Sequence, residues 1–167
     1  MFELKRIAQE SVPSALEKAH RYRLLNEPLE AESICRDVIE VEPENQQALC
    51  TLVLALTDQL QQELTAAFAQ ARETVAKLKS EYEREYYSGI ICERRAKVHH
   101  ERGVPDSGSM AYKWFRQAME HFENAERTQP AGHDDAILRW NTCARIIDRY
   151  PVIKPAEEAP PSPIELE

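Results

Sequence analysis

The side chains best suited to chemistry lie close together in the second half of the chain. Basic residues crowd the stretch 94–102, with only Glu93 and Glu101 as acidic residues beside or among them. The basic residues are Arg94, Arg95, Lys97, His99, His100 and Arg102. A run of this kind can receive an acidic peptide or RNA phosphates, and it is also typical of a solvated helix face.

The adjacent residues His99 and His100 raise the question of a metal site, with Glu101 or Asp106 as further ligands. A metal-dependent hydrolase built on this pair is one alternative for the function. Adjacent residues on an α-helix, however, point about 100° apart, which separates two neighbouring histidines. We therefore interpret them as cationic groups near a helix C-terminus, where the helix dipole favours positive charge.

The remaining reactive residues form no pattern typical of catalysis. The other histidines, His20, His121 and His133, are isolated, and no GxSxG, HExxH or P-loop motif occurs. The four cysteines are separated by 15, 42 and 51 residues, too far apart for a CxxC pair or a zinc-finger pattern. We expect their side chains to be small buried hydrophobic groups, and we predict neither enzymatic activity nor a cofactor.

Composition favours a single helical domain. The chain has 167 residues, of which 43% are hydrophobic, 30% are charged and only 4 are glycine, too few for the turns of an all-β protein. The net charge of −8 disfavours general binding to nucleic acid. No apolar run approaches the ~20 residues that span a bilayer, and the first residues lack the apolar region of a signal peptide. We expect a soluble, cytoplasmic protein that does not bind membranes.

Apolar spacing and proline positions predict a series of helices. Apolar residues recur every three or four positions, and prolines mark the helix boundaries. Ser80 and Glu83 have the spacing of a capping box and predict a helix break near Ser80, whereas the run 103–109 predicts a loop. The predicted helices cover residues 13–25, 28–42, 45–59, 61–102 with the break near Ser80, 111–125 and 134–149.

Two helix ends share a pattern of residues at a constant offset of 87 positions. Ala31, Cys35, Val38 and Pro43 have the same gaps as Ala118, Phe122, Ala125 and Pro130. In each set, small residues allow close helix packing, a larger side chain fills the groove, and proline ends the unit. This pattern resembles the second half of the tetratricopeptide repeat. Gly89, preceded by Tyr86 and Tyr87, resembles the small residue between aromatic residues of the repeat's first half.

The resemblance implies antiparallel helix pairs stacked as a short right-handed superhelix over residues 1–150, with a C-terminal capping helix from about Trp140. It also implies a protein-binding adaptor or scaffold without enzymatic activity, which holds a peptide or helix of a partner protein in a concave groove. Side chains of the first helix of each pair line that groove in the family. On this frame they are His20, Arg23, Asp58, Tyr86, Arg94, Asn141 and Arg145.

Two further expectations concern the basic run and the end of the chain. An RNA-binding repeat protein that uses Arg94, Arg95, Lys97 and Arg102 is a second alternative for the function. Residues 151–167 contain five prolines and four glutamates, and we predict that they form a flexible tail. Charge complementarity further predicts that this tail contacts the basic helix end and competes with a partner, through Glu157, Glu158, Glu165 and Glu167.

Overall fold

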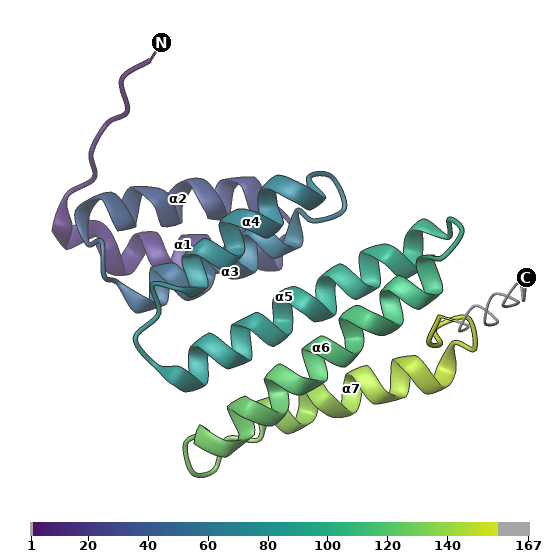
Figure 1. The fold of residues 1–167 in the computed structure, drawn as a ribbon. Helices are drawn as coiled ribbons and strands as arrows, with labels where there is room; N and C mark the ends of the chain where they lie inside the picture. The colour runs from purple at the N-terminus through teal and green to yellow at the C-terminus, as the bar shows by residue number, and fades with distance from the viewer. Residues whose placement is uncertain (1, 157–167) are drawn as a thin grey trace, which may run out of the picture.

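The computed structural model describes residues 2–156. All regular elements in this range are helices, which confirms the predicted all-helical class (Figure 1). A short 3₁₀-helix, η1 (Gln9–Ser11), precedes the α-helices. The α-helices within the described range are α1 (Val12–Leu24), α2 (Pro28–Val41), α3 (Gln46–Asp58), α4 (Leu64–Val75), α5 (Glu81–Arg102), α6 (Ser107–Thr128) and α7 (Asp135–Arg149).

Local capping explains both ends of α5. The Ser80 side chain accepts a hydrogen bond from the backbone N–H of Glu83 (3.3 Å), so the predicted break at Ser80 is the start of α5. Gly103, at the other end of α5, has a φ of +60°, the left-handed conformation that glycine adopts readily. The predicted loop over residues 103–109 is too long, because α6 begins at Ser107, whose side chain is buried against the core.

Each helix packs against the next along the chain, and α1 also contacts α3 while α3 contacts α5. In Figure 1, α1–α4 lie together on one side of the molecule and α5–α7 on the other. The α5 and α6 helices pack closely at Gly89. A Cβ atom at this position would lie only 2.4 Å from the Phe122 ring, so a side chain larger than hydrogen does not fit.

The positions of the internal similarity are core positions in both halves. Ala31, Cys35 and Val38 of α2 are fully buried, as are the equivalent residues of α6, which are Ala118, Phe122 and Ala125. The equivalent prolines, Pro43 and Pro130, each stand two residues beyond the helix end. One core cluster lies among α5, α6 and α7 and a second joins α1–α5, so the shared pattern marks buried positions in both halves of the chain.

The packed part of the chain extends past the predicted boundary at residue 150. Ile153 is buried in the core formed by α5, α6 and α7, and its backbone N–H donates to the carbonyl of Tyr150 (2.8 Å). The four glutamates of the predicted tail, from Glu157 onward, lie outside the described residues. Within residues 2–156, no helix combines the length and the apolar character that crossing a membrane requires.

Candidate functional site

Ion pairs connect the four odd-numbered helices on one face. We call this set the ion-pair cluster. It brings together side chains from α1, α3, α5 and α7. The residues that pair between different helices are 35 to 46 positions apart in the chain. The members are Arg23, Asp58, Glu93, Arg94, Lys97 and Arg139.

Asp58 occupies the centre of one half of the cluster. Arg23 of α1 donates through Nε to Oδ2 of Asp58 (2.9 Å), and Arg94 of α5 donates through Nη1 to Oδ1. The three side chains are only 14%, 19% and 24% exposed for Arg23, Asp58 and Arg94 respectively. One carboxylate of α3 therefore connects α1 to α5, and it balances two largely buried guanidinium groups.

Glu93 is the centre of the other half, and its side chain is completely buried. Lys97, one turn further along α5, donates to Oε1 of Glu93 (2.5 Å), and Arg139 of α7 lies 3.3 Å from both carboxylate oxygens. Tyr86 also hydrogen-bonds to Arg139. A buried carboxylate is costly unless it is paired, so this set of partners holds α7 against α5.

The cluster carries more positive than negative charge. Its four cations surround only two carboxylates, although the whole chain has a net charge of −8. Burial, together with repulsion from Arg23 and Arg139, lowers the pKa of Arg94 to about 10. Burial also lowers the pKa of Arg139, but Glu93 and Tyr86 outweigh that effect and raise it overall. The excess positive charge makes this face suitable for an anionic partner.

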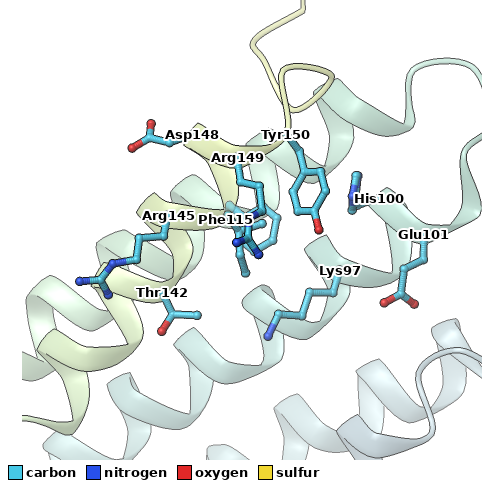
Figure 2. A pocket seen from close by; sticks show the side chains of 10 residues that line it. Lys97, His100, Glu101, Phe115, Thr142, Arg145, Asp148, Arg149 and Tyr150 are labelled. Carbon is cyan, nitrogen blue, oxygen red and sulfur yellow. The ribbon is translucent and has the colours of Figure 1, made fainter.

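Beside the cluster, α5 and α7 enclose a pocket of about 740 Å³, which we call the α5–α7 pocket (Figure 2). Phe115 of α6, Ile146 and Tyr150 supply its apolar wall. Figure 2 shows Arg149 and Tyr150 reaching from α7 toward Lys97 on α5, while Asp148 extends away from α5. Because Lys97 belongs to both sites, the pocket continues the ion-pair cluster toward the C-terminal end of α7.

Several polar groups of the α5–α7 pocket have no partner. Arg145 and Arg149 are exposed, and neither forms a salt bridge or hydrogen bond within residues 2–156. The Nδ1 atom of His100 is buried without a hydrogen-bond partner, although its ring packs against Tyr150 with centroids 4.6 Å apart. Glu101, in contrast, accepts a hydrogen bond from Gln61. The pocket therefore offers cationic and hydrogen-bonding groups beside an apolar wall.

The structure brings together most of the seven side chains that the sequence predicts for partner binding. Arg23, Asp58 and Arg94 form one half of the ion-pair cluster, and Tyr86 contacts the other half through Arg139. Arg145 lines the α5–α7 pocket. The remaining two lie elsewhere. His20 is exposed on α1, and Asn141 is half-buried on α7, and neither belongs to the cluster or lines the pocket.

The basic run does not form one surface, because helical geometry distributes it around α5. Arg94 and Lys97 face the ion-pair cluster, whereas Arg95 packs over two contacting aromatic rings, 4.1 Å from the centre of Phe68 and 4.2 Å from that of Trp114. The interpretation of the run as a solvated helix face is therefore wrong. Trp114 is half-buried in this stack, while Phe115 and Phe122 are core residues as predicted.

The histidine pair also differs from its interpretation. Burial, and then repulsion from Arg95 and Arg102, lowers the pKa of His99, which disfavours the cationic form expected at a helix end. His100 lies on another side of α5, in the α5–α7 pocket. In the described range, no group of three or more His, Cys, Asp or Glu side chains is arranged to hold a metal ion, so the predicted alternative of a histidine-based metal site has no support.

The cysteines are free thiols. Cys35, Cys92 and Cys143 are buried, as predicted, and Cys50 is half-buried. Burial raises the pKa of Cys35 and Cys143 to about 12, and that of Cys50 and Cys92 to about 11. All four are therefore protonated and poorly nucleophilic near neutral pH.

Sequence reasoning missed Glu93, Lys97 and Arg139 as site residues. One signal was available, because Glu93 and Lys97 have the four-residue spacing of a helical ion pair, and Glu93 lies in the apolar part of α5 close to Ile90 and Ala96. Arg139 gave no such signal, since its partner lies 46 residues away.

Comparison with known proteins adds no relative: no family model, curated protein or solved structure matches the chain. The resemblance to tetratricopeptide repeats accordingly rests on the residue pattern of the sequence. The packing of consecutive helices and the repeated core positions are compatible with that pattern.

Proposed function

We propose that this chain is a non-enzymatic protein-binding adaptor, in which tetratricopeptide-like helix pairs stack as a short right-handed superhelix. A peptide or helix of a partner protein binds along the face of α1, α3, α5 and α7, and the protein acts in the cytoplasm. The observation that carries this proposal is the ion-pair cluster, which places excess positive charge on the odd-numbered helices of an acidic chain.

The distribution of the basic run favours a protein partner over RNA. Binding to a phosphate backbone draws on several cations presented along one surface. Here Arg94 is ion-paired, and Arg95 packs over two aromatic rings on a different side of α5. A peptide needs fewer charges, and it also gains from the tyrosine side chains near the cluster.

The test is direct binding of a polypeptide first captured by the full-length protein and then purified. Reversing Arg94 is unsuitable for this purpose, because a carboxylate there would face Asp58 in a largely buried position. Arg139→Gln is better suited, since the Arg139 side chain is 34% exposed and Lys97 still pairs with Glu93 in this variant; urea denaturation checks that the variant keeps its fold. We expect Arg139→Gln to weaken binding about tenfold, in line with the loss of one charge-assisted contact.

Arg127→Gln is the matched control, because Arg127 is exposed on α6, away from the odd-numbered helices. Binding by this variant should equal that of the unmodified chain. Equal losses in both variants would show a general charge effect and contradict binding at the odd-helix face. Retention of an RNA with a steep salt dependence, and of no polypeptide, would replace the adaptor by the RNA-binding alternative.

A further inference from the structure

The α5–α7 pocket combines an apolar wall with unpaired arginines, and one peptide could contact both. Ile146 and Tyr150 offer apolar contact, and the fully buried Phe115 lies beneath them. Arg145 and Arg149 offer guanidinium groups that no carboxylate within residues 2–156 engages. Its volume of about 740 Å³ lies within the range of ligand-binding pockets in proteins.

The spacing of the two arginines also indicates an anionic ligand. Residues four apart on a helix are neighbours, and like charges at this spacing destabilise a helix by about 0.2–0.5 kcal/mol per pair. A carboxylate between Arg145 and Arg149 would remove that repulsion and accept charge-assisted hydrogen bonds. Arg94 and Arg139 cannot serve in this way to the same extent, since Asp58 and Glu93 already engage them.

We propose that the α5–α7 pocket binds an acidic peptide segment of a partner protein, with an apolar side chain of the segment against Ile146 and Tyr150 and flanking carboxylates on Arg145 and Arg149. This inference rests on the proposed adaptor function and names the chemistry of its partner.

Other occupants fit the pocket less well. Glu101 and Asp148 also line it, so its unpaired arginines match one or two carboxylates rather than the closely spaced charges of a continuous phosphate backbone such as that of RNA. The chain's own C-terminal end is acidic, but its described residues do not line the pocket, because Ile153 is buried in the core and Pro155 and Ala156 line cavities beside the start of α6. A separate partner is therefore the occupant that the structure favours.

The test uses a short fluorescent peptide in which one phenylalanine is flanked by glutamates, titrated with the full-length protein at low salt and followed by fluorescence anisotropy. We expect the double variant R145E/R149E to lose at least tenfold in affinity. Replacing the phenylalanine of the peptide by alanine should also weaken binding, and a peptide with lysines in place of the glutamates should not bind. Both arginines are exposed, so circular dichroism should show an unchanged helical content.

K18E/R21E is the matched control, because it makes the same change in net charge at two exposed residues of α1 that form no salt bridge in the described structure. It should bind the peptide like the unmodified chain. Equal losses in the two double variants, full affinity of R145E/R149E, or stronger binding of a short RNA than of the peptide would each overturn the proposal.

A variant with glutamine at the four tail positions, Glu157, Glu158, Glu165 and Glu167, extends the test to the chain's own acidic end. Tighter binding of the peptide to this variant, lost again when R145E/R149E is added, would support the pocket as the acceptor of acidic segments. The inference and the proposed function can fail separately. A captured partner that binds R145E/R149E normally but loses affinity for Arg139→Gln would contradict the pocket proposal and agree with the proposed adaptor function.

Discussion

The ion-pair cluster and the α5–α7 pocket use the same types of residue in opposite ways. In the cluster, arginines are largely buried and each faces a carboxylate, as Arg23 and Arg94 face Asp58. In the pocket, Arg145 and Arg149 are exposed and have no carboxylate partner in the described structure. The two sites are adjacent and share Lys97, so burial and pairing, rather than residue type, distinguish them.

This difference teaches which cations stabilise the fold and which are available to a ligand. A paired and buried guanidinium fixes the positions of the helices that it joins, because breaking the pair leaves an uncompensated charge in a poorly hydrated place. An unpaired and exposed guanidinium contributes little to stability and keeps its hydrogen-bonding capacity for a partner. The predictions below separate the two sites by the size of their effects on the free energy of unfolding.

The largest effect should come from the cations around Glu93. The double variant K97M/R139M leaves a completely buried carboxylate without a cation, and we expect it to lower the free energy of unfolding by about 3–5 kcal/mol. Urea denaturation followed by circular dichroism measures this change. Adding E93M should restore most of the stability, because an apolar replacement of a whole buried ion-pair set is often tolerated. A loss below about 1 kcal/mol in the double variant would contradict the role assigned to Glu93.

The next largest effect should come from Asp58→Asn, which removes the charge between Arg23 and Arg94. We expect a loss of about 2–3 kcal/mol in the free energy of unfolding, because two guanidinium groups that are at most 24% exposed would lose their counter-charge. The control is Asp37→Asn on α2, a half-buried residue without a salt bridge in the described range, with an expected change within about 0.5 kcal/mol. Equal effects of the two variants would remove the distinction between paired and unpaired charges.

The buried side of α7 can be tested through Cys143. Burial, followed by the nearby Glu93, raises the pKa of this thiol from 9.0 to about 12. As the pH rises, the thiol therefore loses its proton in the unfolded chain before it does so in the folded chain. The contribution of the protonated Cys143 to the free energy of unfolding is complete below pH 9 and declines up to about pH 12. Compared with Cys143→Ala, the unmodified chain should lose up to about 1.4 kcal/mol more per pH unit in that window. Parallel pH dependences of the two proteins would show that this side of α7 is hydrated.

The smallest effect should come from R145Q/R149Q in the pocket. Removing the repulsion between these residues offsets the loss of a positive charge near the C-terminus of α7, so we expect the free energy of unfolding to change by no more than about 0.5 kcal/mol. The same urea denaturation measures it. A loss above about 1 kcal/mol would place these arginines among the residues that hold the fold together, and it would weaken the contrast with the ion-pair cluster.

Much of the helical framework could be predicted because its causes are local. The predicted start of a helix at Ser80 depends on a side chain and a backbone N–H three residues apart, and Pro28 opens α2 as the proline position predicts. The loop after Arg102 was predicted too long, because burial is not visible in local sequence. The turn-forming residues at 107–109 belong to the first turn of α6, where Ser107 is buried.

The candidate site could be predicted only in part. The helix frame placed Arg23, Asp58 and Arg94 on one face, and the structure joins them by ion pairs. The frame could not show that Asp58 neutralises both arginines, nor that Glu93 recruits Arg139, because these contacts depend on how α3, α5 and α7 pack against one another. For the same reason it could not distinguish paired from unpaired arginines.

The sequence by itself determined the all-helical class, most helix boundaries and the core positions repeated at an offset of 87 residues, since propensity, capping and apolar spacing act within a few residues along the chain. Only the tertiary structure decided which charges are buried together and which remain available, and where α5 and α7 leave a pocket. The ion pairs between helices join residues 35 to 46 positions apart. The energy of each pair depends on how far its contact excludes solvent, which no local pattern of residues determines.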